Sequence, residues 1–343
     1  MKKKSAASKF FASKTFTLII LFIVMYVVFA FITKGSMLKP VNIRSMLNSI
    51  VIVGLLAIGE SFLMISGSID LSAGNVGTAS AILLAYFLMD YHFPWYVALL
   101  IALAFGALTG TLNATLVFKF NFQPFIATLA MSDIAKGLGY IFCFDSTGQA
   151  SINIDNPVFN YIGKAKLLGG AVPVSLFICL ALLIIYGIIL KMTKFGRSVY
   201  LIGGNRQASL LAGLNPTRIS YICFINGGIL FSLAGVLAMC RTKTATVTGI
   251  ASQQFSGITA AVLGGIAFGG GAGGMFGCFV GLLVLNCFNT GMDLVGVNTY
   301  WQMVFSGVLL LIALGFDIIN SKRTANKLFK ESQQSFAADK ANS

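Results

Sequence analysis

The sequence predicts an all-α polytopic membrane protein with about ten transmembrane helices. Three observations support this prediction: 57% of the 343 residues are hydrophobic, only 10% are charged, and the apolar residues gather in long runs. A soluble domain carries about 25% charged residues, so this chain could not cover itself with a hydrated surface. Because a helical crossing of the bilayer needs about 20 apolar residues, the chain is best divided into spans.

Glycine, proline and charged residues divide the apolar runs into ten expected spans. We expect a basic segment at 1–14, a transmembrane domain at 15–320 and a flexible polar tail at 321–343. The first span exceeds the usual apolar core of a signal peptide, about 7–15 residues, and is therefore expected to be retained. The ten expected spans are 15–33, 43–66, 72–90, 95–118, 123–144, 171–191, 218–240, 253–270, 274–292 and 299–320.

The distribution of basic residues supports an even number of spans, because cytoplasmic loops are enriched in Lys and Arg. With the N-terminus inside, ten spans place sixteen Lys and Arg residues inside, seven outside and Lys136 within a span. Most of the inside residues lie near the two termini and in a central loop at 191–218. We therefore expect both termini in the cytoplasm and the chain in a bacterial inner (plasma) membrane. This clustering also accounts for the net charge of +14 without nucleic-acid binding.

Several kinds of site are disfavoured by the sequence. The six cysteines lie in apolar runs without paired metal spacing, and His92 is the only histidine. We expect the cysteines to act as small hydrophobic residues, and we expect no metal site. The chain contains no GxxxxGK[ST] motif, so it cannot hydrolyse ATP by the P-loop route. Energy for any transport must come from a partner protein or from an ion gradient.

Two Gly-rich segments are expected to interrupt the spans, at Ser66–Gly77 and Gly264–Gly277. One lies in each half of five spans, as in transporters built from two inverted repeats, although no residue-by-residue repeat is visible. Irregular backbone at membrane depth survives only inside protein or beside a water-filled cavity, so these breaks indicate a translocation pathway. The candidate residues are Asp70, Ser72, Gly74, Asn75, Gly264, Gly265, Gly269 and Gly270. Glycines at four-residue spacing, which indicate close helix packing, are Gly106 with Gly110, and Gly273 with Gly277 and Gly281.

Ionisable residues within spans are costly and are functional candidates by default. Glu60 has no obvious local partner and is the best candidate for lining a polar cavity. Asp70 has an alternative role, as a cap at the start of the third helix. Asp133 and Lys136 are three residues apart, so they could pair on one helix face.

The central loop contains a short, well-capped helix. Asn205 is a favourable N-cap, Arg206–Ala212 are expected to be helical, and Gly213 and Pro216 end the helix. Such a helix could dock on a partner protein or could lie on the lipid headgroups. The residues assigned to this element are Gly203, Gly204, Asn205, Arg206, Gln207, Ala208, Gly213, Leu214, Asn215 and Pro216.

From about Asn42 to Asp317, the sequence resembles permease subunits of the ribose/xylose/galactose-type ABC sugar importers. The resemblance rests on six motifs in the family's order. They are GESFLMISGSIDLSAGNV at 59–76, QPFIATLAMSDIAKGL at 123–138, FGRSVYLIGGNRQASLLAGLN at 195–215, SLAGVLAM at 232–239, ITAAVLGGIAFGGGAGGMFG at 258–277 and NTGMDLVGVNTYWQM at 289–303.

The resemblance implies an importer that moves a sugar or sugar-like solute by alternating access. It implies a second permease subunit, with a homodimer expected, a cytoplasmic ATPase that binds ATP and Mg, and an extracytoplasmic solute-binding protein. The chain itself would bind no cofactor, and residues 203–216 would form the helix that couples to the ATPase. This sequence has Arg206-Gln207-Ala208 where the family usually has an acidic residue and two alanines, and Gln254, Ser256 and Ala272 replace usual charged residues.

Two alternatives remain open from the sequence. One is an ABC permease for a nucleoside, a branched-chain amino acid or a signalling furanosyl compound. The other is an ion-coupled secondary carrier, although such a relay usually contains more acidic and His residues than this chain supplies.

Overall fold

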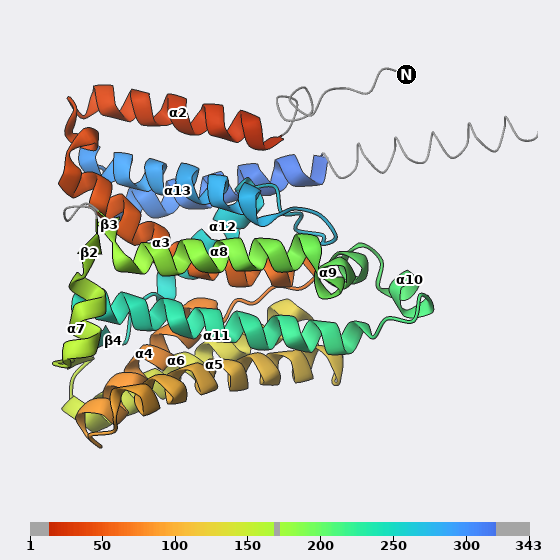
Figure 1. The fold of residues 1–343 in the computed structure, drawn as a ribbon, viewed down its shortest axis with the longest axis horizontal. Coiled ribbons are helices and arrows are strands. Elements are labelled where there is room, and N and C mark those ends of the chain that lie inside the picture. The colour runs from red at the N-terminus through yellow and green to blue at the C-terminus, as the bar shows by residue number, and fades with distance from the viewer. Residues whose placement is uncertain (1–13, 168–171, 320–343) are drawn as a thin grey trace, which may run out of the picture.

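The computed structural model describes residues 14–167 and 172–319, and it confirms the all-α prediction. Most helices lie side by side along the long axis of the molecule, while α10 projects from one end and α7 and the short strands lie at the other (Figure 1). We call these the α10 end and the opposite end. The elements are α2 (Lys14–Ile32), η1 (Ser36–Leu38), α3 (Pro40–Ile65), α4 (Ala73–Met89), α5 (Trp95–Phe118), α6 (Pro124–Thr147), β1 (Ser151–Asn153), α7 (Pro157–Lys164), β2 (Lys166–Leu167), β3 (Val172–Pro173), α8 (Val174–Met192), α9 (Lys194–Gly204), α10 (Arg206–Leu211), α11 (Pro216–Thr242), β4 (Thr244–Thr246), η2 (Ala251–Gln253), α12 (Gln254–Leu263) and α13 (Met275–Val295), followed by a last span at Thr299–Ile319.

Each of the ten expected spans contains a helix, but two of these helices are short. Eight described helices are long and apolar enough to cross a membrane, whereas α4 has 17 residues and α12 has 10. The eighth expected span, 253–270, is helical only over Gln254–Leu263, because the helix ends where the Gly-rich interruption at Gly264–Gly277 was predicted: Gly264 follows α12, and Gly265 has a φ of +87°. The short helices occupy the third and eighth places, equivalent positions in two halves of five.

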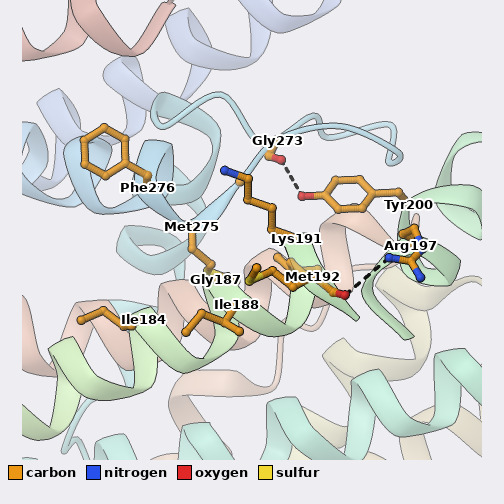
Figure 2. A pocket seen from close by; sticks show the side chains of 12 residues that line it. Ile184, Gly187, Ile188, Lys191, Met192, Arg197, Tyr200, Gly273, Met275 and Phe276 are labelled. Carbon is orange, nitrogen blue, oxygen red and sulfur yellow. Dashed lines mark hydrogen bonds between the residues drawn. The ribbon is translucent and has the colours of Figure 1, made fainter. Parts of the chain in front are cut away.

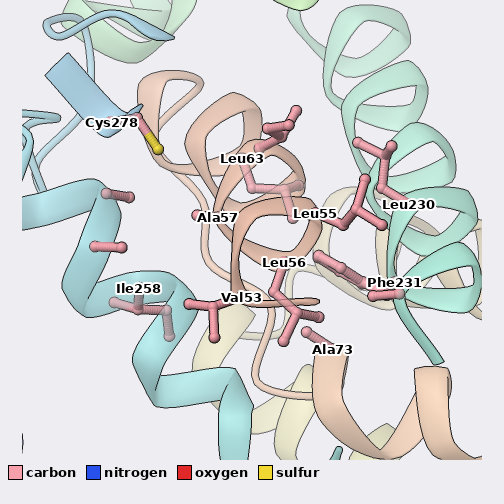
Figure 3. Packing of buried hydrophobic residues seen from close by; sticks show 14 of the residues in the cluster. Val53, Leu55, Leu56, Ala57, Leu63, Ala73, Leu230, Phe231, Ile258 and Cys278 are labelled. Carbon is pink, nitrogen blue, oxygen red and sulfur yellow. The ribbon is translucent and has the colours of Figure 1, made fainter. Parts of the chain in front are cut away.

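Helix α3 forms the centre of the molecule. Its apolar window is 89% buried, and Leu55, Leu56 and Leu63 pack against side chains of α11, α12 and α13 (Figure 3). The partners from those helices are Leu230, Phe231, Ile258 and Cys278. Helix α4 is also buried on nearly all sides. An apolar helix that is surrounded by other helices holds its position by packing, so α3 and α4 give the bundle a fixed interior.

Glycines bring several helix pairs into backbone contact. A Cβ at Gly106 of α5 would overlap the carbonyl oxygen of Gly228 on α11, and a Cβ at Gly110 would overlap that of Phe224. Gly277 and Gly281 of α13 approach the backbone at the end of α12 in the same way. The predicted packing role of these four glycines is therefore confirmed. Gly273 differs, because it precedes α13 and lies in a loop with a φ of +118°.

The opposite end carries a small cap that the sequence analysis did not predict. Strand β1 pairs with β4 in antiparallel register, and the amphipathic helix α7 packs against α11. Gly163 of α7 approaches the backbone of Cys240 so closely that a Cβ would overlap its carbonyl oxygen. The cap therefore attaches the segment between the fifth and sixth spans, α6 and α8, to the end of α11.

The outer helices have the surface expected of lipid-facing spans. None of the apolar window of α2 is buried, and only 6% of that of the last span is buried. All six cysteines are free and buried within helices, which matches their predicted role as small hydrophobic residues. The expected basic segment at 1–14 lies, apart from Lys14 in α2, outside the described residues, and so does the polar tail at 321–343.

Candidate functional site: a projecting helix and the two helix breaks

Helix α10 is a short, capped element that projects from the bundle (Figure 1). The Asn205 side chain accepts a hydrogen bond from Ala208 N at 2.9 Å, and Gly213 follows the helix with a φ of +80°. Leu210 and Leu211 are 62% and 89% exposed. Two exposed leucines on this capped projection form a small apolar surface suited to a protein partner.

Arg206 anchors the base of α10 to the bundle. Its guanidinium lies 4.6 Å from the centre of the Phe118 ring on α5, and its Nη atoms donate to Ser220 and Thr217 at 3.4 Å. Partial burial lowers the pKa of this guanidinium from its usual value, but an arginine keeps its charge at neutral pH. The arginine that departs from the family pattern therefore joins α10 to α5 and α11.

Helix α9 precedes α10 and was not predicted. Thr193 caps its start by accepting from Gly196 N at 3.0 Å, and Val199 and Ile202 face the core. The Tyr200 hydroxyl donates to Gly273 O at 2.7 Å, and burial raises the pKa of this phenol, which therefore remains a donor. Figure 2 shows this bond beside a pocket of about 570 Å³ between α8, α9 and the start of α13.

Four glycines from three distant segments meet at the end of α9. A Cβ at Gly203 would overlap Ile65 O, and it would lie 2.7 Å from Gly271 N. Gly271 N also donates to Ile65 O at 2.9 Å. Gly67 and Gly270 complete the contact, since the Cα of Gly67 would lie 3.0 Å from a Cβ at Gly270. We call Gly67, Gly203, Gly270 and Gly271 the glycine junction; it joins α9 directly to both expected helix breaks.

The first helix break contains a buried network of polar groups. Asp70 Oδ1 accepts from Ser72 N at 2.8 Å and from the Ser72 hydroxyl, while Asp70 Oδ2 accepts from Asn113 Nδ2 at 3.1 Å. Leu71 N donates to Thr128 Oγ1 at 3.0 Å. A carboxylate beside the start of α4 complements the positive end of the helix dipole. The network therefore supports the capping role of Asp70. Ser72 occupies the N-cap position, but its side chain makes no capping hydrogen bond, whereas Asp70 accepts from the Ser72 backbone.

The starts of the two short helices meet inside the molecule. A Cβ at Gly74 of α4 would lie 2.7 Å from Ala251 O, and Ile250 N donates to Thr78 Oγ1 at 3.1 Å. Asn75 donates to Ser132 Oγ of α6 at 2.8 Å. The segment before α12 thus runs alongside the first turn of α4, and both helix N-termini lie within the bundle. This is the arrangement of broken helices found at the binding sites of transporters.

Residues 42–314 match a family described as the permease component of the branched-chain amino acid transport system. The chain belongs to this permease family. It is 34% identical to the ribose import permease protein RbsC of Bacillus subtilis, over 85% of this chain and 89% of that protein. It is 29% identical both to the fructose import permease protein FrcC of Rhizobium meliloti (87% and 84% covered) and to the L-arabinose ABC transporter permease protein AraH of Azospirillum brasilense (88% and 86%).

These matches confirm the resemblance to permeases of ribose-type ABC importers. The protein is a multi-pass inner-membrane permease subunit of an ABC transporter, a class that works with an ATPase and a solute-binding protein.

The predicted site residues of the permease form two groups. Asp70, Ser72, Gly74 and Asn75 gather at the start of α4. Gly203 and Gly270 meet in the glycine junction, but Gly203 and Gly204 belong to the end of α9 and not to α10. The remaining predicted residues of the projecting element, Gln207, Ala208, Leu214, Asn215 and Pro216, lie in α10 or lead into α11, where Asn215 is the N-cap and Pro216 the first residue.

Other candidates of the permease lie apart from these groups. Glu60 is fully buried in α3, with its Oε2 3.5 Å from Asp70 N and its Oε1 without a hydrogen-bond partner. Gly265 and Gly269 have no atom within 4 Å of an added Cβ, whereas Gly264 packs against α13. Asp133 and Lys136 are both exposed on α6. Sequence reasoning did not single out Ile65 or Tyr200, which no local pattern marks, and it placed Gly271 only within the expected Gly-rich break.

Proposed function

We propose that this chain forms the translocation pathway of an ATP-driven importer for a monosaccharide or a similar sugar. The observation that carries the proposal is the continuous link from the exposed tip of α10, through α9 and the glycine junction, to both helix breaks. A displacement of α10 would be transmitted to the segments that interrupt the membrane-spanning helices. The similarity to permeases named for ribose, fructose and L-arabinose supports a sugar as the solute.

In this proposal, ATP and Mg bind to a separate ATPase subunit, and the chain itself has no catalytic site or cofactor. The ATPase receives Leu210 and Leu211 in a cleft, and the α10 end faces the cytoplasm together with both termini. A solute-binding protein delivers the sugar at the opposite end. The basic residues near α10, including Lys191, Lys194 and Arg197, support this orientation by the positive-inside rule.

The exposed face of α6 supports a second copy of the chain as the other half of the pathway. Asp133 and Lys136 are exposed there, on a helix that is long and apolar enough to cross the membrane. Charged side chains at membrane depth face protein or water and not lipid tails. A second permease packed near this face would enclose both groups.

The experiment is ATP-driven uptake in proteoliposomes that contain the permease, its ATPase and its binding protein. Uptake of radiolabelled D-ribose, D-fructose or L-arabinose that requires ATP and survives a protonophore supports the proposal. Uptake that collapses with the protonophore at constant ATP would identify an ion-coupled carrier. Transport of leucine but none of the sugars would assign the amino-acid solute named in the family description.

The Leu211→Asp variant tests the docking role. Because Leu211 is 89% exposed, the change should leave insertion and melting temperature unaltered. We expect recovery of the ATPase with the tagged permease to fall at least tenfold. Gln207→Ala, an exposed change on the same helix, is the matched control. Full recovery of the ATPase with Leu211→Asp would remove α10 from the interface.

A further inference from the structure

A groove of about 570 Å³ lies between η2, α12, α13 and the last span. Its volume falls within the range of small-molecule pockets, about 300–1,000 Å³. One wall presents Phe255, Ser256 and Thr259 from successive turns of α12. The other walls present Asn289, Gln302 and Ser306.

The polar groups of this groove are neutral and only partly satisfied. No Asp, Glu, Lys or Arg contributes to its lining among the described residues. Asn289 Oδ1 is buried without a hydrogen-bond partner. An unpaired amide oxygen beside several hydroxyls would be costly against lipid tails, so this groove is unsuited to an acyl chain. Water or a hydroxylated ligand would satisfy these groups.

The groove begins at the end where a solute would arrive. Helix α13 starts beside the loop that Tyr200 contacts at the α10 end, and its 21 residues span about 30 Å, so it reaches the opposite end. A second hollow there shares Thr299 and Gln302 with the groove. Gln302 Nε2 donates to Asp293 Oδ1 at 2.7 Å and to Val297 O at 2.8 Å, which fixes the side chain at this mouth.

The inner part of the groove lies beside the start of α12. This helix begins within the bundle, where the preceding segment contacts the first turn of α4. Its first residues are Gln254 and Phe255, so no carboxylate of its own first turn offsets the positive end of the helix dipole. Neutral acceptors on a ligand can approach this end without repulsion from a protein carboxylate.

We propose that this groove is a contact site for an uncharged, polyhydroxylated solute during its passage through the permease. Hydroxyl groups of the solute exchange hydrogen bonds with the side-chain amide of Asn289 and with Ser256 and Ser306, while a C–H face packs on the Phe255 ring. This inference rests on the proposed sugar import and adds the residues that the sugar contacts. It also excludes anionic sugars, because no basic side chain lines the groove.

Cysteine labelling in native membranes tests the groove without measuring transport. Ser256→Cys and Ser306→Cys are treated with the charged thiol reagent MTSET in the full complex. Val308→Cys and Leu311→Cys are matched controls on the last span, exposed but outside the groove lining. The native cysteines are buried and provide a low background. We expect groove positions to react at least tenfold faster than the controls.

Protection by solute identifies the ligand class. D-ribose, D-fructose and L-arabinose are each added at high concentration, with D-ribose 5-phosphate as the charged control. At least one neutral sugar should slow modification severalfold, and the phosphate ester should not. Equal rates at groove and control positions, or no protection by any sugar, overturn the inference. If Ser306→Cys does not react with MTSET but forms a disulfide between two copies of the chain, a second copy fills the groove. That result would also overturn the inference.

Transport by Asn289→Leu separates this inference from the proposed function. We expect sugar uptake to fall at least tenfold while ATPase activity of the complex without sugar is retained, and Val308→Ala should transport normally. If wild-type uptake is ATP-driven but Asn289→Leu is unimpaired, the groove assignment fails and the importer assignment stands. If the wild type moves no sugar, the importer assignment fails, and the labelling rates still report whether the groove holds water.

Discussion

Replacing Gly203 with alanine is expected to uncouple ATP hydrolysis from sugar transport. The added Cβ would overlap Ile65 O and lie 2.7 Å from Gly271 N, two backbone atoms that are hydrogen-bonded to each other at 2.9 Å. Backbone cannot rotate away as a side chain can, so α9 must shift or the bond between Ile65 and Gly271 must break. Overpacking costs about 1–3 kcal/mol. Leaving a buried backbone group unpaired costs about 1–3 kcal/mol more.

The neighbouring residue provides the control. Gly204 has no atom within 4 Å of an added Cβ and belongs to the same last turn of α9. Gly204→Ala should be neutral or should stabilise the helix by up to about 1 kcal/mol. The two variants therefore make the same chemical change at adjacent positions. They differ in that the added Cβ meets the backbone of Ile65 and Gly271 only at Gly203.

The assay is the ratio of sugar transported to ATP hydrolysed in proteoliposomes. We expect this ratio to fall at least tenfold for Gly203→Ala and to stay near the wild-type value for Gly204→Ala. Tyr200→Phe is a milder test of the same region, because it removes only the hydrogen bond to Gly273 O. A normal ratio for Gly203→Ala in a correctly inserted complex would refute the role of the glycine junction in transmission.

Two further predictions concern stability. Gly106→Ala places a Cβ 2.8 Å from the carbonyl carbon of Gly228 and should lower the melting temperature in detergent, whereas Gly137→Ala, with open space around it, should leave it unchanged or raise it. Equal melting temperatures would contradict close packing of α5 on α11. Asp70→Ala should destabilise the permease by about 2–4 kcal/mol because Ser72 N and its hydroxyl lose their acceptor, and Asp70→Asn should recover most of the loss. If Asp70→Asn proves as damaging as Asp70→Ala in thermal unfolding, the charge and not the hydrogen bond is what matters.

Local signals in the sequence were sufficient to predict some elements in detail. Asn205 and Gly213 bound the projecting helix as expected, because capping depends on residues close in sequence. Helix α9 was missed although Thr193 is a favourable N-cap, because its basic residues, Lys194 and Arg197, resemble those of a solvated loop.

Other features depend on contacts between segments that are far apart in the sequence, and these contacts could not be predicted from local patterns. The glycine junction joins residues 65–67, 203 and 270–271, and no local pattern relates these segments. Similarly, the Gly-rich composition predicted an interruption at Gly264–Gly277, but it could not predict that Gly264 packs on Gly277 of α13. The groove was also not predicted, since its walls come from three helices and a turn.

The two short helices have a consequence for how the chain enters the membrane during synthesis. Ten residues of α12 extend only about 15 Å, half of the hydrocarbon thickness, so this segment cannot be held in the bilayer by its own hydrophobicity. It packs on α3, made much earlier, and on α13, made next. We therefore expect α12 to reach its final position together with these neighbours, after α3 has entered the membrane.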